Sequence, residues 1–320
     1  MHRALALYSG GLDSLLSILI VKEQGIDVVA LKFFTGFTAP LNENDLNYAK
    51  KFGFKIEEID IREKFIEVLK NPEYGYGKNL NPCIDCKILM LKEAKERLSK
   101  YNASFIITGE VLNQRPMSQK REVLKLIENK STLNGLILRP LSAKLLIPTK
   151  PEAEGIVNRE LLYDIWGRTR KPQLNLAKKY GIEKPPQPAG GCLLTEPSFC
   201  RKVKDLIEYD ELTVQNIELL KIGRHFRVSE HCKVIVGRDE KENEFLLNNH
   251  YGTFIYPKDF KGPVVLLTGN CSEKNIDMAA SICAYYSKRK TLEVVIKTAT
   301  QEEIKIYSAI TEEEILKYRL

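Results

Sequence analysis

The hexapeptide Ser9-Gly10-Gly11-Leu12-Asp13-Ser14 lies between an apolar run, residues 4–8, and an amphipathic run, residues 15–22. This placement predicts a loop that joins a first strand to a first helix. Two adjacent glycines allow close approach to the backbone, and a helix N-terminus offers N–H groups and the positive end of the helix dipole. The loop is therefore expected to bind an anion, with phosphate as the first candidate. It lacks the lysine and the spacing of the Walker-type loop, which argues against a kinase or GTPase.

The first half of the chain alternates apolar runs with amphipathic runs. The expected strands are residues 3–8, 27–34, 55–61, 104–108 and 136–138, and the expected helices are 15–24, 44–52, 63–70, 85–100 and 117–128. Such alternation predicts a parallel sheet with helices on both faces. Ligands of such sheets bind at the carboxyl ends of the strands, where the hexapeptide falls.

The pattern changes along the second half. A basic helical stretch is expected over 150–180, then a loop rich in proline and glycine over 183–191, and a helix over 197–210. Beyond it, short strands are expected at 225–228, 233–236, 253–256, 264–267, 292–298 and 303–308, with helices at 240–248, 272–286 and 311–318. This is typical of a small α+β domain, so we expect two domains, 1–210 and 211–320.

The net charge of +7 is concentrated in one part of the chain. Residues 111–210 hold 18 Lys and Arg against 11 Asp and Glu, which equals the whole excess. This favours a polyanionic partner such as nucleic acid, with a solvated lysine-rich surface as the alternative. No apolar run reaches the roughly 18 residues that cross a membrane, and no secretory leader is recognised. We therefore expect no membrane contact and a cytoplasmic location.

Seven cysteines in a chain without a recognised leader argue against a disulfide framework. Cys83 and Cys86 form a Cys-x-x-Cys pair, and Cys192 follows the loop rich in proline and glycine. Three uses compete: a closed zinc site that adds Cys200, a redox pair, or a three-cysteine iron–sulfur cluster with one iron open to an exogenous ligand. The residues alone do not choose between zinc and iron. The other cysteines are each expected to be buried small apolar side chains: Cys232, Cys271 and Cys283.

The hexapeptide resembles the signature of the N-type ATP pyrophosphatases, or PP-loop enzymes, which cleave ATP between the α- and β-phosphates and use AMP to activate a carbonyl oxygen. With the cysteines and Thr108-Gly109-Glu110, the chain resembles the tRNA thiolation enzymes over roughly residues 1–206. The closest likeness is to the catalytic domain of tRNA 4-thiouridine synthetases. Residues 107–119 look like that family's second nucleotide-site motif, and Cys192 falls where its sulfur-handling cysteine is expected. Related thiolases with this cysteine pattern carry a [4Fe–4S] cluster.

The resemblance implies an adenine nucleotide alpha hydrolase-like, PP-loop α/β fold that uses ATP and Mg²⁺. Asp13, as Mg²⁺ ligand or loop-orienting residue, and Cys192, as sulfur-handling residue, are the expected catalytic residues. The residues expected to bind the nucleotide are Ser9, Gly10, Gly11, Leu12, Asp13, Ser14, Lys32, Phe33, Thr108, Gly109 and Gln114. Gln114 and Arg115 are expected to reach a phosphate or the target base. The expected ligands of a [4Fe–4S] cluster, or of zinc as the alternative, are Cys83, Cys86 and Cys192.

The C-terminal portion resembles the RNA-binding domain of NFACT-type ribosome quality-control proteins, in residues 222–227 and 236–243. Such a domain would supply an RNA-docking surface, with a dimerisation or packing domain as the alternative. The N-terminal RNA-binding domains and the rhodanese domain of the 4-thiouridine synthetases are not recognised, which leaves the modified position and the sulfur donor open. Whether the chain forms a homodimer is also open.

The expected function is therefore that of an ATP-dependent tRNA sulfurtransferase. It would adenylate a uridine carbonyl and replace its oxygen with sulfur, giving 4-thiouridine in preference to 2-thiouridine. The sulfur would come from sulfide on the open iron or from a persulfide on Cys192, and the basic residues of 168–184 would contact the RNA backbone. Two alternatives stay open: a PP-loop amidotransferase or ligase acting on a small molecule, and a non-catalytic RNA-binding protein with structural zinc.

Overall fold

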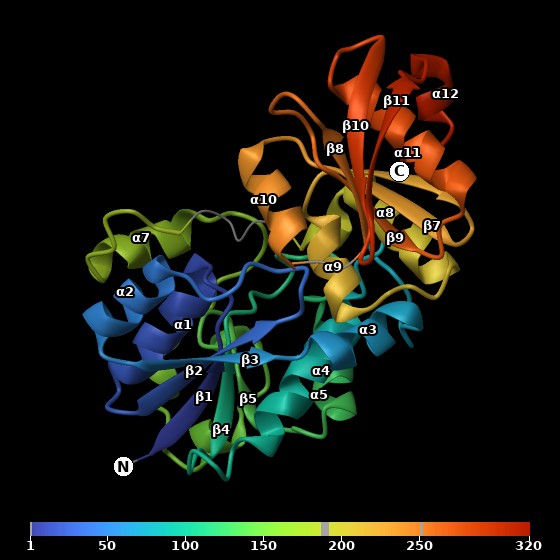
Figure 1. Ribbon diagram of the computed structural model, residues 1–320. Coiled ribbons are helices and arrows are strands. Elements are labelled where there is room, and N and C mark those ends of the chain that lie inside the picture. Colours follow the sequence, from blue (N-terminus) through green and yellow to red (C-terminus); the bar gives the residue numbers. More distant parts are fainter. Residues whose placement is uncertain (1, 187–191, 250–251) are drawn as a thin grey trace. The chain divides into compact units, whose positions relative to one another are not determined.

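The computed structural model describes residues 2–186, 192–249 and 252–320. The chain forms two compact units, Met1–Glu196 and Pro197–Leu320 (Figure 1). The boundary expected at 210 falls after helix α8, Pro197–Glu208, which belongs to the second unit. Within the described ranges, no helix combines the length and the apolar character needed to cross a membrane.

The first unit is built on a five-stranded parallel sheet of order β3-β2-β1-β4-β5, as the alternating pattern predicted. Its strands are β1 Arg3–Leu7, β2 Asp27–Phe34, β3 Lys55–Asp60, β4 Phe105–Thr108 and β5 Ile137–Leu138. Its helices are α1 Leu12–Lys22, α2 Glu43–Phe52, α3 Arg62–Lys70, α4 Cys83–Glu96, α5 Arg121–Lys130, α6 Lys150–Ala153 and α7 Lys171–Lys179. The α/β class expected for this half of the chain is confirmed.

Helices cover both faces of this sheet (Figure 1). Alternate residues of β1 face opposite sides: Ala4 and Ala6 pack with α1 and α7, whereas Leu5 and Leu7 pack with α4 and α5. Strand β1 pairs with β2 on one side and with β4 on the other, so the order of the strands reverses at β1. The hexapeptide therefore lies at the topological switch point, where ligands of such sheets bind.

The continuous helical stretch expected over 150–180 is wrong. The structure has only α6 and α7 there, with a 3₁₀ turn at Arg159–Leu161. Between them the backbone pairs with other segments, because Ile165 N donates to Leu141 O and Gly167 N donates to Leu112 O, each at 2.8 Å. Part of the expected loop, residues 187–191, lies outside the described residues.

The second unit is a six-stranded antiparallel sheet of order β11-β10-β8-β9-β7-β6. Its strands are β6 Arg224–Ser229, β7 Cys232–Val236, β8 Thr253–Pro257, β9 Val265–Gly269, β10 Thr291–Lys297 and β11 Glu302–Ser308. Besides α8, its helices are α9 Val214–Leu220, α10 Glu240–Asn249, α11 Glu273–Tyr286 and α12 Glu312–Leu316. Helix α11 packs on one face of the sheet, and α9 and α10 pack on the other. The smaller α+β domain expected here is confirmed.

Two of the isolated cysteines differ from expectation. Cys232 and Cys271 form a disulfide with a Cα–Cα distance of 5.0 Å. Antiparallel pairing places Cys232 opposite Gly269, two residues before Cys271, so the pairing of β7 with β9 brings the thiols together. Cys283, on α11, is fully buried within the apolar core, as expected.

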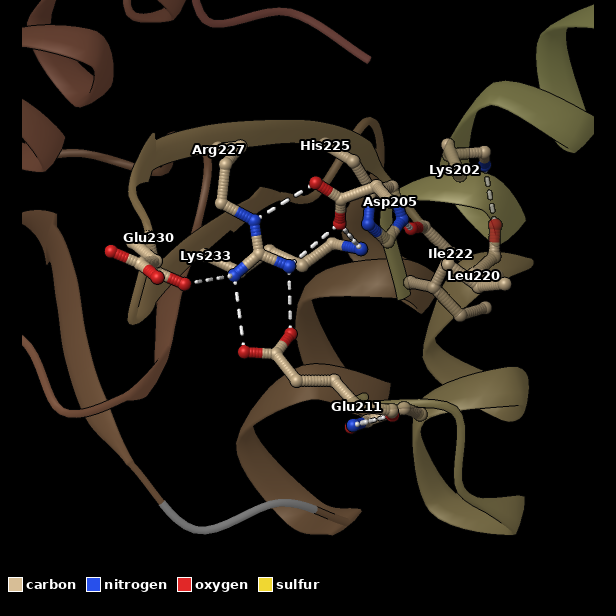
Figure 2. A network of polar contacts seen from close by, with 10 residues as sticks. Lys202, Asp205, Glu211, Leu220, Ile222, His225, Arg227, Glu230 and Lys233 are labelled. Atoms are coloured by element: carbon tan, nitrogen blue, oxygen red, sulfur yellow. Dashed lines mark hydrogen bonds and ion pairs between the residues drawn. The ribbon is translucent and has the colours of Figure 1, made fainter. Parts of the chain in front are cut away.

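A buried ionic network joins α8 to the sheet of the second unit (Figure 2). Arg227 on β6 donates to Asp205 on α8 at 2.7 and 2.9 Å, and to Glu211 at 2.7 and 3.1 Å. Lys233 on β7 donates to the same Asp205 at 2.9 Å. The side chains of Asp205 and Lys233 are only 5% and 4% exposed, so each charge depends on its partners.

We predict that Asp205→Asn lowers the unfolding free energy of the second unit by about 3 kcal/mol or more, because Lys233 loses the carboxylate with which it pairs and stays buried. Calorimetry, with hydrogen exchange of β6 and β7 peptides, measures the loss. Glu240→Gln is the matched control, because its pair with Lys261 is exposed and should contribute nothing measurable. Equal stability of the two variants would contradict the prediction.

A second prediction concerns His225, which is buried beside this network (Figure 2). Burial, with the nearby Lys233 and Lys202 ammonium groups, holds the pKa of His225 well below its usual value. Below about pH 6.5 the His225 imidazole therefore takes up a proton in the unfolded chain but stays neutral in the folded chain. The free energy of unfolding then falls by up to about 1.4 kcal/mol for each pH unit of acidification. Unfolding of the second unit followed from pH 7.5 to 5.5 should show this slope, and His225→Gln should remove it.

Candidate functional site

Hydroxyl groups organise the hexapeptide loop between β1 and α1. Ser14 Oγ donates to Gly11 O at 2.8 Å and lies 3.3 Å from both Ser9 N and Ser9 Oγ. Gly11, the residue before α1, has no side chain to cap the helix. The first N–H groups of α1 therefore stay available to an anion, as the sequence predicts for a phosphate site.

Glycines at two positions allow close approach of backbone segments. Gly10 has φ +77°, and a Cβ there would lie 3.1 Å from Asp45 Oδ1. A Cβ on Gly109, just after β4, would lie 2.5 Å from Ser14 N and 2.7 Å from Asp13 C. The backbone after β4 thus rests on the first turn of α1, so the two expected nucleotide motifs meet.

Asp13 sits at the centre of the site. Its Oδ2 accepts from Gln114 Nε2 at 3.0 Å, while its buried Oδ1 has no hydrogen-bond partner among the described residues. Burial raises the pKa of Asp13, and Gln114, Arg170 and Arg115 partly offset this rise. An orphaned carboxylate oxygen is a hard donor of the kind that suits Mg²⁺.

Several predicted nucleotide residues are placed by buried contacts. Lys32, 4% exposed, pairs with Asp45, which also accepts from Tyr8 Oη at 3.1 Å. Phe33 packs its ring into the core facing α4, so only its main chain could meet a nucleotide. The Leu12 side chain is likewise buried, in the core facing α7. These side chains support the loop and leave its backbone as the binding surface.

A second buried cluster lies after β4. Glu110, 2% exposed, accepts from Thr108 Oγ1 at 2.9 Å and from Arg139 Nε at 3.1 Å, and Lys87 Nζ lies 4.0 Å from its other oxygen. Burial raises the pKa of Glu110, but Lys87 and Arg139 outweigh it and hold that pKa below its usual value. This ionised group fixes the end of β4 and the segment that begins at Arg139.

The expected cysteines come together in the first unit. Cys83 and Cys86 occupy the first turn of α4, three residues apart and hence on one face. Burial, together with the neighbouring Cys192 and Cys83 thiols, raises the pKa of Cys86 to about 12, which places all three near one another. Cys200, by contrast, is buried in the second unit.

Residues 192–195, here called the Cys192 strap, are tied to two other segments. Leu193 N donates to Phe37 O at 3.0 Å, beyond the end of β2, and Leu194 O accepts from Leu80 N at 3.2 Å. Asn79 Nδ2 donates to Thr195 O at 2.7 Å. These bonds hold Cys192 beside the first turn of α4. Among the described residues, however, no three Cys, His, Asp or Glu side chains already form a metal-binding group.

Positive side chains connect the thiols with Asp13. Arg115 lowers the pKa of both Asp13 and Cys83, so its guanidinium lies near both. Lys87 likewise acts on Cys83, Cys86 and Glu110. The nucleotide loop and the thiols therefore belong to one site.

Some contributors to this site were not predicted. Arg170 was expected only as an RNA-backbone contact, yet it acts on Asp13. Gln173, fully buried on α7, lies close to the same carboxylate. The Pro172 that starts α7 is the one local signal for a helix N-terminus there, and nothing local shows that this end meets α1.

A parallel sheet whose glycine- and hydroxyl-rich loop lies at the switch point places the first unit among the α/β folds that are typical of nucleotide-binding proteins. Residues 1–144 match the family described as thiamine biosynthesis protein (ThiI), and residues 223–319 match the NFACT protein RNA binding domain. The chain thus joins a domain similar to ThiI to a domain similar to the NFACT RNA-binding module, as expected from the sequence.

Individual relatives match parts of the chain. The tRNA-specific 2-thiouridylase MnmA of Amoebophilus asiaticus (strain 5a2) is 32% identical over 184 residues, 49% of this chain and 48% of that protein. The probable tRNA sulfurtransferase of Thermococcus kodakarensis is 29% identical over 142 residues, 43% of this chain and 36% of that protein. The chain therefore spans half or less of the length of these two curated relatives. A 4-thiouridine synthetase–RNA complex with bound ATP is 17% identical, with a TM-score of 0.40 over 69% of this chain and 52% of that chain, which is a weak likeness.

Proposed function

We propose that the chain is an ATP-dependent tRNA sulfurtransferase that adenylates a uridine carbonyl and replaces its oxygen with sulfur. The observation that carries this proposal is a chain of contacts between the thiols and the nucleotide loop. Lys87, next to Cys86 on α4, lies 4.0 Å from Glu110, and Glu110 follows Gly109, which packs on the first turn of α1. A PP-loop site that only activates a small molecule has no need of such a cluster. The resemblance of residues 107–119 to a motif of the 4-thiouridine synthetases favours 4-thiouridine as the product, with 2-thiouridine as the alternative given the thiouridylase relatives.

The hexapeptide loop would bind the phosphates of ATP. The N–H groups of residues 10–14 and the hydroxyls of Ser9 and Ser14 would hold the departing pyrophosphate, and Asp13 would hold Mg²⁺ through its orphaned Oδ1. Main-chain groups at Lys32–Phe33 and Thr108–Gly109 would hold the adenosine. The cationic Arg115 would offset the charge that develops on the phosphates during AMP transfer.

The thiols of Cys83, Cys86 and Cys192 would handle the sulfur. Soft thiolate donors suit an iron–sulfur cluster or zinc, and a [4Fe–4S] cluster on three cysteines supplies one iron position for an exogenous sulfur ligand. The hydrogen bonds of the Cys192 strap to Phe37, Asn79 and Leu80 support a position of Cys192 near the first turn of α4, which suits either a cluster ligand or a persulfide carrier. We favour the cluster and keep zinc as the alternative.

The RNA would be bound by both units. The match of residues 223–319 to an RNA-binding domain supports a docking role for the second unit. Exposed basic residues of the first unit would contact the backbone: Arg168, Lys171, Lys178, Lys179 and Lys184.

The deciding experiment measures AMP and pyrophosphate release from ATP with and without tRNA, together with mass spectrometry of the tRNA nucleosides. We expect tRNA-dependent AMP formation and, with a sulfur source, a thiouridine whose fragmentation and absorbance separate the 4-thio from the 2-thio isomer. Turnover without tRNA but with ammonia would indicate a small-molecule ligase. RNA binding without any ATP cleavage would indicate a non-catalytic protein.

The metal content tests the cluster separately. Protein purified without oxygen should hold iron and labile sulfide near four each per chain, as a [4Fe–4S] cluster requires. Stoichiometric zinc without iron would overturn the cluster and leave the sulfurtransferase proposal standing.

A further inference from the structure

A groove in the first unit lies beside the Asp13 site. Neither the AMP transfer nor the sulfur handling proposed for the chain uses it. Its volume is about 600 Å³, and it is lined by Leu112, Asn113, Lys120, Arg121, Glu122, Leu145, Asp164 and Trp166. We propose that this Trp166 groove binds an unpaired nucleotide of the RNA substrate, with the base stacked on the indole. The inference rests on the proposed function and adds to it the surface that receives the RNA next to the reacting atoms.

Trp166 is the only tryptophan of the chain, and it is 61% exposed. Its backbone is held on both sides, since Ile165 N donates to Leu141 O and Gly167 N donates to Leu112 O, each at 2.8 Å. A large aromatic ring on an anchored backbone, facing solvent, is the platform on which unpaired bases stack.

Polar groups surround the indole. Asn113, held at φ +60° with its N donating to Gln119 O at 2.8 Å, offers both an amide donor and an acceptor. Glu122 and Asp164 offer carboxylate acceptors for the N–H groups of a base, and Lys120 and Arg121 offer cations for a phosphate. Two cations balance two anions, so the lining suits a base with its own phosphate better than a bare polyanion.

The position of the groove links it to catalysis. Asn113 immediately precedes Gln114, whose side chain donates to Asp13 Oδ2 at 3.0 Å, and Arg115 follows. Leu112 N donates to Ser142 Oγ at 3.0 Å, which fixes this wall to the segment after β5. A base that leaves its stack to enter the groove is thereby brought to the edge of the nucleotide site, as a base-modifying enzyme requires.

Because Trp166 is the sole tryptophan, fluorescence excited at the red edge of the tryptophan band, where the 14 tyrosines absorb little, reports on this groove alone. Titration with tRNA or with an unstructured oligouridylate should quench the emission saturably. In the AMP-forming assay, Trp166→Ala should raise the KM for tRNA about fivefold or more without changing the KM for ATP, as the loss of one base–aromatic stack predicts. Trp166→Phe, which keeps a ring, should recover most of the affinity. Ile147→Ala is the matched control, because that side chain is 78% exposed and lies outside the lining.

The fluorescence titration uses the unaltered chain, so it stands even if a variant fails to fold. Binding of tRNA without any change in tryptophan emission overturns the groove proposal. Equal quenching by ATP or UMP alone also overturns it, because the groove would then be a mononucleotide site. If the unaltered chain releases no AMP with tRNA, the proposed function fails, whatever the fluorescence shows.

Discussion

Cys192→Ala should abolish tRNA thiolation and leave ATP binding intact. Both routes for the sulfur, as an exogenous ligand of a cluster or as a persulfide, need the Cys192 thiol. The fold should survive, because Leu193 and Leu194 tie the Cys192 strap to other segments through main-chain atoms. The hexapeptide loop is closed by its own Ser9 and Ser14 contacts and keeps its nucleotide. Mass spectrometry of tRNA nucleosides and calorimetric titration with an ATP analogue measure the two effects.

Cys200→Ala is the control variant for this experiment. Cys200 is buried in the second unit and has no part in the three-cysteine proposal, so thiolation should persist. Loss of thiolation and of one zinc per chain in this variant would favour the four-cysteine zinc site. Normal thiolation by Cys192→Ala would refute both sulfur routes.

Gly109→Ala should lower tRNA-dependent AMP formation by about 100-fold, the cost of displacing reacting groups by roughly an ångström. The added Cβ would lie 2.5 Å from Ser14 N and 2.7 Å from Ser14 Cα, and both are backbone atoms that no side-chain rotation can move away. The N-terminus of α1 must therefore shift from the end of β4, and the phosphate-binding N–H groups shift with it. Pyrophosphate release under saturating ATP is the measurement, with circular dichroism to check the fold.

Gly25→Ala separates the effect on the site from the general cost of altering a glycine. Gly25 follows α1 with φ +79° and has no atom within 4 Å of an added Cβ, so alanine there brings backbone strain without a clash. Its AMP formation should stay near that of the unaltered chain. If Gly109→Ala were as active as Gly25→Ala, the close packing of α1 on β4 would have no bearing on catalysis.

The fold of the first unit could be predicted because short stretches of sequence are enough to mark its strands and turns. Buried parallel strands read as continuous apolar runs, and the glycines of the hexapeptide mark the turn into α1. The region 150–180 could not be predicted in this way, because hydrogen bonds from Ile165 and Gly167 to distant segments replace helical ones. The Cys232–Cys271 disulfide spans 39 residues and depends on β7 pairing with β9, which no local pattern reveals.

The candidate site likewise combines residues that the sequence marks with contacts that only the folded chain creates. Ser9–Ser14 and the Cys83/Cys86 pair carry local signatures, so the sequence already marks them as candidate site residues. The contacts that unite them come from tertiary packing: Arg115 between Asp13 and Cys83, and Arg139 against Glu110. Trp166 gave no signal in the sequence, because a lone tryptophan is more often part of a core and only the fold shows that it faces solvent.

The Cys192 strap also bears on how a cluster held by the three thiols would be maintained. In small zinc domains the metal creates the fold, and its removal unfolds the chain. Here Phe37, Leu80 and Asn79 hold the strap by hydrogen bonds that involve no thiol. Damage by oxygen or a chelator would therefore leave an intact scaffold that is ready to be reloaded. Such a protein can be repaired after oxidative stress instead of being degraded and synthesised again.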